Sequence, residues 1–247
     1  MSDECKFIVD FLNCEYELFS SETNPNDILE RFNQLTEQGN RDGFYPLIVI
    51  PSDTLVDTLE IFVEDNNVEN TPESIAACRQ TAIDAANAAD VGEFLSARLS
   101  EAMKIYSGGS HDILGKFVQA APQSALTLQT LTEESSGEVL IAKIPTANPW
   151  ELAAWMPMGG FNECPAPAEQ VAIFRYWYEK YGAVPAAVSY DTWQMTLARP
   201  PATEGEAEAL AREQFAFCAD IVEQGAETIR GLASILKGAA VWFFWWD

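Results

Sequence analysis

Runs of apolar and polar positions predict a helix, a buried strand and a second helix in the first quarter of the chain. The first helix covers 24–39, with Asn24 as its N-cap and Gly39 after its end. Residues 44–50 form a continuous apolar run, which is typical of a strand buried on both faces. A second helix is expected to begin at Ser52. Because the connection before it lacks glycines, it does not indicate a phosphate-binding loop.

The next part of the chain is rich in alanine and is expected to be helical. Thr71 precedes a long helical pattern over 72–105, with a break expected at 91–92. The segment 107–112 contains glycines and serines, which indicates a connection between elements. It holds the single histidine, His111, which we interpret as a solvated loop residue.

Two segments in the middle of the chain, 125–131 and 138–144, are predicted to pair as a hairpin. The first alternates apolar and polar residues, and a polar turn with a glycine separates the two. Prolines follow the second segment and mark a boundary. We therefore divide the chain into an acidic N-terminal region of helices and strands, 1–144, and a C-terminal domain, 145–247, packed together as one compact unit.

The C-terminal third has the clearest pattern of apolar positions. Its predicted elements are a helix over 169–182, strands over 186–190 and 193–197, a helix from the capping box Thr203/Glu206 to about 223, a helix over 227–237 and a buried aromatic strand over 240–247. The whole pattern predicts an α+β fold, or a mixed α/β fold. A central β-sheet is expected to be flanked by helices, with the aromatic-rich C-terminal strand buried.

Composition and charge narrow the functional classes. The chain is 48% hydrophobic and 21% charged, which is typical of a globular protein, and its formal charge of −24 argues against nucleic-acid and anionic-membrane partners. No apolar run is long enough to span a membrane, and the N-terminus does not resemble a secretory signal. One histidine and five cysteines without a C-x-x-C pair predict no metal site and no cofactor. We expect reduced thiols and a cytoplasmic location.

An ordered series of motifs in the C-terminal part points to a known family. The motifs are Gly159–Pro165, Tyr176-Trp177-Tyr178, Arg199-Pro200-Pro201, Ala209–Gln214, Cys218 with Asp220 and Gln224, and the terminal Trp242–Asp247. Together they resemble the bacterial domain of unknown function 4253 family over roughly 145–247. The resemblance implies no reaction, cofactor or catalytic residue. Candidate site residues therefore rest on their own chemistry.

The first candidate site is the turn that contains Asn162 and Cys164, just before a predicted helix. Backbone amides near a helix start can hold an anion and can lower the pKa of a cysteine thiol. Cys164 is thus a candidate nucleophile and Asn162 a candidate binding residue. A structural turn, in which Asn162 bonds to the backbone, is the favoured alternative.

The second candidate site lies at a helix end, where Asp220 and Gln224 are one turn apart on the same face. Together with Arg175 or Arg199, they are candidates for binding a polar ligand, with Asp220 also a candidate catalytic residue. The alternative, which we favour, is that Asp220 and Gln224 satisfy backbone groups at a junction between helices.

The third candidate site is aromatic. Most tryptophans and tyrosines of the C-terminal part are expected in the core. The aromatic side chains could line a pocket for a planar or sugar-like ligand, or form the centre of a protein interface. Trp155 is the candidate binding residue, because the segment 155–158 combines Trp, Met and Pro outside any periodic element and is the part we expect to be exposed.

These observations support three functional hypotheses. The leading one is a non-catalytic cytoplasmic interaction protein whose acidic surface meets a basic protein partner, in the manner of a toxin-neutralising protein. The first alternative is an enzyme with a site that joins Asn162 and Cys164 to Asp220. The second is a small-molecule binding module that uses the aromatic side chains.

Overall fold

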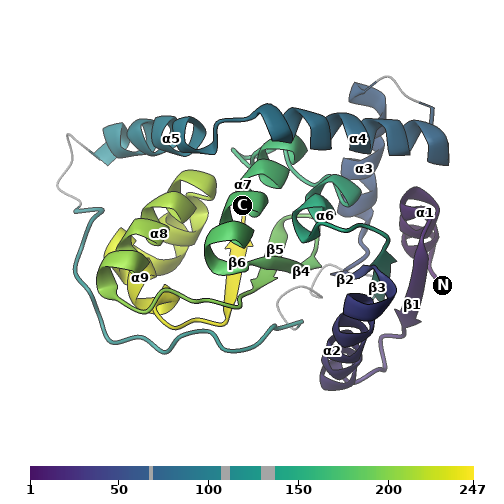
Figure 1. The fold of residues 1–247 in the computed structure, drawn as a ribbon, viewed down its shortest axis with the longest axis horizontal. Coiled ribbons are helices and arrows are strands. Elements are labelled where there is room, and N and C mark those ends of the chain that lie inside the picture. The colour runs from purple at the N-terminus through teal and green to yellow at the C-terminus, as the bar shows by residue number, and fades with distance from the viewer. Residues whose placement is uncertain (67–68, 107–111, 129–136) are drawn as a thin grey trace.

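A six-stranded mixed sheet organises the protein, in the order β1-β3-β2-β4-β5-β6 (Figure 1). The computed structural model describes residues 1–66, 69–106, 112–128 and 137–247. The strands are β1 (Glu15–Phe19), β2 (Tyr45–Val49), β3 (Val139–Ile144), β4 (Val184–Val188), β5 (Thr192–Thr196) and β6 (Val241–Trp245). β2 and β4 run parallel, and the other neighbouring strands are antiparallel. The α+β expectation is confirmed.

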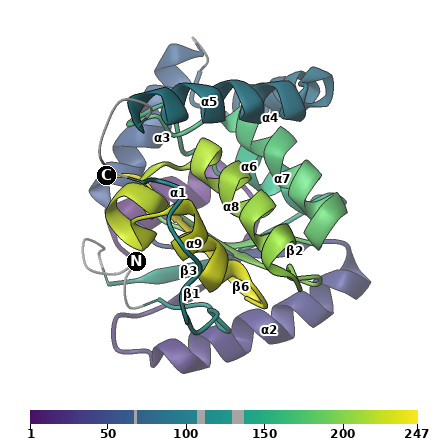
Figure 2. The same cartoon turned by 90° about the vertical axis from the view of Figure 1, so that its left-hand side faces the viewer.

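Helices cover both faces of this sheet. They are α1 (Asp3–Leu12), α2 (Pro25–Asp42), α3 (Asp53–Asp65), α4 (Pro72–Ala88), α5 (Val91–Tyr106), α6 (Leu152–Trp155), α7 (Pro167–Tyr181), α8 (Glu204–Phe217) and α9 (Ile229–Leu236). Figure 2 shows α2 on one side of the sheet and α4 and α5 on the other. None of the helices in the described ranges is long and apolar enough to cross a membrane.

The central strand β2 is buried on both faces, as its apolar run predicts. Leu47 and Val49 pack into the larger core beneath α3 and α7, whereas Ile48 packs against α2. Successive residues of a strand point to opposite faces, so a continuous apolar run is needed where both faces are covered. Ser52 then caps α3, because its hydroxyl accepts a hydrogen bond from the Leu55 amide at 3.2 Å.

An aromatic cluster joins α7 and α8 to the last strand. The Trp177 ring stacks on Phe244 with centroids 5.4 Å apart and meets Trp242 edge to face at 5.5 Å. All three side chains are essentially inaccessible to water. The expectation of a buried aromatic C-terminal strand is therefore confirmed.

The ends of two predicted helices are wrong. α2 continues past Gly39 to Asp42, because Gly39 is buried inside the helix, where an added Cβ would lie 2.2 Å from the Phe44 carbonyl oxygen. Gly43, with φ of +83°, ends the helix instead. α8 ends at Phe217 and not near 223, and a π-helical turn, Ile221–Ala226, follows it.

The predicted hairpin between 125–131 and 138–144 is also wrong. The second segment contains β3, but its neighbours are β1 and β2, so both of its edges are already paired. Residues 125–128 form no strand, and the Gln194 side chain bonds both the amide and the carbonyl of Thr127. The remainder of the first segment lies outside the described residues.

The other predicted boundaries are close to those observed. The break in the long helical stretch falls at 89–90, between α4 and α5, directly before the expected 91–92. The connection that holds His111 lies outside the described residues. The division of the chain at residue 144 stays a prediction, although strands from both sides of it form one sheet.

Candidate functional site

A hollow of about 1010 Å³ lies beyond the carboxyl ends of the parallel strands β2 and β4. We call it the larger hollow. Its walls come from α3, α4 and the segment 157–168, and its other lining residues are 190–191 and 245–247. In open sheets with parallel strands, ligands commonly bind in the crevice outside the carboxyl ends of those strands.

A second hollow of about 540 Å³ adjoins the first. We call it the smaller hollow. α5, the end of α8 and the start of the π-helical turn line it. Asn162 and Asp247 line both hollows, so these two residues lie where the hollows meet. The two hollows are therefore neighbours, and we call the pair of them the groove.

Residues 159–163, which we call the divider loop, separate the hollows in an uncommon backbone conformation. The φ angles of Gly159 and Gly160 are +135° and +81°, and those of Asn162 and Glu163 are +42° and +61°. Non-glycine residues with positive φ cost about 1–3 kcal/mol each and cluster at functional sites. At Gly159 a side chain is excluded, because its Cβ would lie 2.3 Å from the Pro165 carbonyl oxygen.

Gln170, a fully buried residue of α7, holds this loop in place. Its amide nitrogen donates to the carbonyl oxygens of Met158 and Pro165, the latter at 2.8 Å. Its amide oxygen accepts a hydrogen bond from the Trp193 indole at 2.8 Å. One side chain thus connects both ends of the divider loop to the central sheet.

The larger hollow is lined by acids and aromatic rings. Its carboxylates belong to Asp57, Asp65, Asp191 and Asp247, and the described residues that line it include no Lys, Arg or His. Asp57 and Asp65 are exposed on α3. Asp191 is buried and accepts hydrogen bonds from the hydroxyls of Ser189 and Thr192 and, at 3.0 Å, from the Trp245 indole.

The smaller hollow is also acidic. Its carboxylates belong to Glu101, Glu163, Asp220, Glu223 and Asp247. Its one basic residue, Arg98, already donates to the carbonyl oxygens of Ala216 and Glu163, at 2.8 and 2.6 Å. These bonds hold the guanidinium against the protein backbone and leave the carboxylates of the groove in excess.

The structure brings two of the candidate residues, Asn162 and Asp220, to the same smaller hollow. The Asp220 carboxylate accepts a hydrogen bond from the Gln224 amide at 3.1 Å and another from the Asp247 backbone amide at 3.2 Å. Asp220 and Gln224, one turn apart, therefore share a face, as their spacing predicts. Part of the Asp220 carboxylate is therefore used to hold the last residue of the chain.

Cys164 lines neither hollow. It is buried against Met158 and Gln170, and burial raises the pKa of its thiol well above the ordinary value. A nucleophile needs the opposite shift, because the thiolate is the reactive form. This position favours packing over catalysis for Cys164.

The two candidate arginines are occupied elsewhere. Arg175 donates to the Asn87 side chain at 2.7 Å, and Arg199 donates to the carbonyl oxygens of Tyr178 and Glu179 near the end of α7. Neither lines the groove as the described residues define it.

The expectation that 155–158 is exposed is wrong. Met156 and Met158 are inaccessible to water, and Trp155 is half-buried under the guanidinium of Arg79, 3.3 Å from its ring centroid. This segment follows the short helix α6 and packs into the larger core. Its apolar side chains fill tertiary contacts that no local periodicity reveals.

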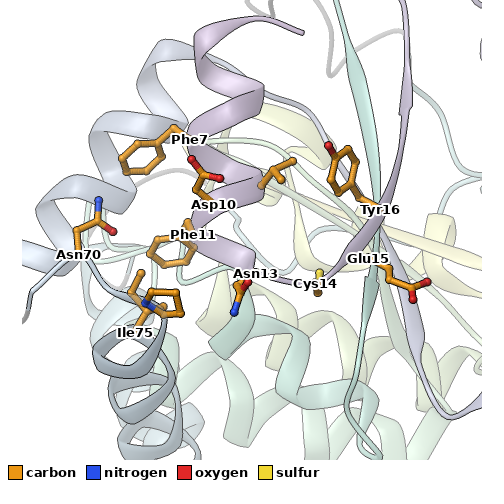
Figure 3. A pocket seen from close by; sticks show the side chains of 11 residues that line it. Phe7, Asp10, Phe11, Asn13, Cys14, Glu15, Tyr16, Asn70 and Ile75 are labelled. Atoms are coloured by element: carbon orange, nitrogen blue, oxygen red, sulfur yellow. The ribbon is translucent and has the colours of Figure 1, made fainter.

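A third hollow, of about 930 Å³, lies next to α1 (Figure 3). Phe7 and Phe11 from α1, Tyr16 from β1 and Ile75 from α4 line it, and its acids are Asp10 and Glu15. Cys14 lies at its edge, and burial raises the pKa of that thiol to about 11. Asn13, with φ of +47°, is the one residue with positive φ among the described residues that line this hollow.

No group of three or more His, Cys, Asp or Glu side chains in the described parts of the chain is arranged to hold a metal ion. Most acids of the groove, among them Asp57, Asp65 and Asp191, are not evident as site residues from the sequence, and neither is Gln170, which holds the divider loop. Asp57 and Asp65 were not singled out because acids on an exposed helix face are common, and only the approach of the divider loop makes a hollow of that face.

Comparison with known proteins gives one match. Residues 140–247 match the family model for Domain of unknown function (DUF4253), which confirms the resemblance identified in the sequence. No curated protein and no solved structure matches the chain. The matched segment includes the divider loop, Gln170 and Asp220, whereas α3, α4 and α5 precede it.

Proposed function

We propose that this protein is a non-catalytic interaction protein of the cytoplasm, and that it holds a basic segment of a partner protein in the acidic groove. The observation that carries the proposal is the charge of the groove. The lining contains eight carboxylate side chains, and Arg98, its one basic side chain among the described residues, is held by backbone carbonyls.

Like charges placed close together repel each other, and a basic partner relieves that repulsion. The formal charge of −24 would also speed the encounter with such a partner through long-range attraction. The buried thiol of Cys164 supports a binding role over covalent catalysis.

The test measures binding of a lysine- and arginine-rich peptide by fluorescence anisotropy at several salt concentrations. The groove variant carries four substitutions: D57N, D65N, E101Q and E163Q. The control variant removes the same number of charges from the α2 side of the sheet: D27N, E30Q, E37Q and D42N. We expect the groove variant to bind about tenfold more weakly and the control to change about twofold or less.

Equal losses in both variants would contradict the proposal, because net charge alone would then explain binding. To find the native partner, the wild type, the control variant and the groove variant are each used as bait in a lysate at low salt. A basic protein captured by the wild type and by the control, but not by the groove variant, is the expected result.

A further inference from the structure

We infer that the larger hollow takes an arginine side chain of the partner as its anchor. The inference rests on the proposed function and deepens it, because it names the chemical group that enters one part of the groove. It comes from the combination of a cavity, aromatic rings, free carboxylates and a buried unpaired donor.

The aromatic walls favour a planar cation. Phe62, Phe161 and Trp245 line the larger hollow. The hydrogen bond from its indole to Asp191 fixes Trp245, and Asp191 is itself held by the hydroxyls of Ser189 and Thr192. A ring held in this way can stack with a guanidinium without losing freedom on binding. Arginine stacks on aromatic faces more readily than lysine does.

The carboxylates of α3 favour a cation with several donors. Asp57 and Asp65 are two turns apart on the exposed face of α3, on either side of Ile61. Ile61 is 55% exposed, so it can contact the methylene stem of an incoming side chain. The guanidinium has five N–H donors in a planar fork, and carboxylates accept them in pairs.

A buried donor at the hollow points to a peptidic ligand. Trp246 lines the hollow, is only 2% exposed and packs against Phe217 and Phe244. Its indole N–H has no hydrogen-bond partner, which is also true of Trp242 away from the hollow. An unpaired buried donor costs about 1–3 kcal/mol, so an acceptor that reaches it is favoured. A free cation brings no acceptor, whereas an arginine within a peptide also brings backbone carbonyl oxygens.

The experiment compares three versions of the basic peptide used above. The first contains arginine at every basic position, the second lysine, and the third has the central arginine replaced by citrulline, which keeps the shape and removes the charge. We expect the lysine peptide to bind about fivefold more weakly than the arginine peptide, and the citrulline peptide about tenfold more weakly.

Matched variants on the same helix locate the anchor. D57N/D65N removes the two acids of the larger hollow, and E60Q/E64Q removes two exposed acids of α3 that do not line it. We expect the first to reduce affinity for the arginine peptide about fivefold and to abolish the preference for arginine over lysine. We expect the second to leave the affinities for both peptides within about twofold. D10N/E15Q tests the hollow of Figure 3 and is expected to have no effect.

A nuclear magnetic resonance measurement on the wild-type protein tests the donor. The indole N–H signal of Trp246, assigned with Trp246→Phe, is expected to shift downfield when the arginine peptide is added. Equal binding of the arginine and lysine peptides, with D57N/D65N still weakening both, would overturn the anchor and leave the proposed function standing. A loss confined to D10N/E15Q would overturn both.

Discussion

Replacement of Gln170 should lower the unfolding free energy and also weaken peptide binding at the groove. Gln170→Leu therefore tests whether this side chain holds the divider loop. The substitution keeps the approximate size of the side chain and removes all of its hydrogen bonds. It leaves the carbonyl oxygens of Met158 and Pro165 and the indole N–H of Trp193 without their partner. Each group left unpaired in a buried position costs about 1–3 kcal/mol.

The expected loss is therefore about 3–6 kcal/mol of unfolding free energy, since three groups lose a partner and the divider loop can relax only partly. For a chain of this length, about 1 kcal/mol corresponds to a shift of about 2–4 °C in Tm. Urea unfolding followed by tryptophan fluorescence gives the free energy, and calorimetry gives Tm.

The matched control is Gln194→Leu. Gln194 is as completely buried as Gln170, but its amide bonds only the backbone of Thr127, which is part-exposed. Water can reach that peptide group, so we expect a smaller loss of about 1–2 kcal/mol and no change in peptide binding. Gln170→Leu should also weaken peptide binding, because it releases the divider loop.

A second replacement gives an independent check of the hydrogen-bond directions. Gln170→Glu keeps an acceptor for Trp193 but places a carboxylate against the carbonyl oxygens of Met158 and Pro165. A protonated carboxyl can donate to one of them, so the stability of this variant relative to wild type should rise as pH falls. If the urea midpoint of Gln170→Leu equals that of the wild type, the hydrogen bonds of Gln170 do not hold the divider loop and the reasoning is refuted.

Three further predictions follow from single contacts. Cys78, half-buried in the wall of the larger hollow, should react with a thiol reagent before the buried Cys164, as measured by mass spectrometry. The bound basic peptide should slow the reaction of Cys78. Gly159→Ala should lower the unfolding free energy by about 1–3 kcal/mol, whereas Gly205→Ala, with open space around its Cβ position, should not lower it. Hydrogen bonds from two arginines lower the pKa of Glu208, so its stabilising contribution is present above the ordinary pKa and lost as pH falls below it. Glu208→Gln should flatten that part of the acid-unfolding curve.

Local signals in the sequence predicted most helix starts, because caps depend on neighbouring residues. Asn24, Ser52 and Thr203 each accept the expected backbone hydrogen bond, and Gly182 ends α7 in a left-handed conformation. These interactions span only a few residues, so a short window of sequence contains all the information they need.

Pairing between distant strands was not predictable in the same way. β3 pairs with β1 and β2, which lie more than ninety residues earlier in the chain, and the alternating pattern of 125–131 gave a false local partner. Similarly, α8 was expected to run past Phe217, because apolar spacing continues there. The helix instead ends at Phe217, and Cys218 packs against β6, where its thiol donates to the Trp245 carbonyl at 2.9 Å. This contact joins residues far apart in the sequence, so a local pattern cannot predict it.

The candidate site was predictable only in part, for the same reason. Asn162 and Asp220 both line the smaller hollow, but Cys164, which the enzyme hypothesis also placed there, does not. Arg175 and Arg199 do not join them, because each finds acceptors on its own side of the protein. Spacing along one helix can place two side chains on a face, but it cannot identify which distant loop approaches that face.

The arrangement of buried polar groups gives the strongest reason to regard the groove as functional. Asn162 and Glu163, two successive non-glycine residues with positive φ, lie beside the eight carboxylates of the groove, and both features cost free energy. Buried hydrogen bonds of Gln170 fix the divider loop, and those of Asp191 fix the Trp245 ring, both at the groove. Fixed aromatic and acidic groups at an open hollow lower the ordering cost of binding a cation. Loosening these supports should therefore weaken peptide binding even where every carboxylate of the groove is kept.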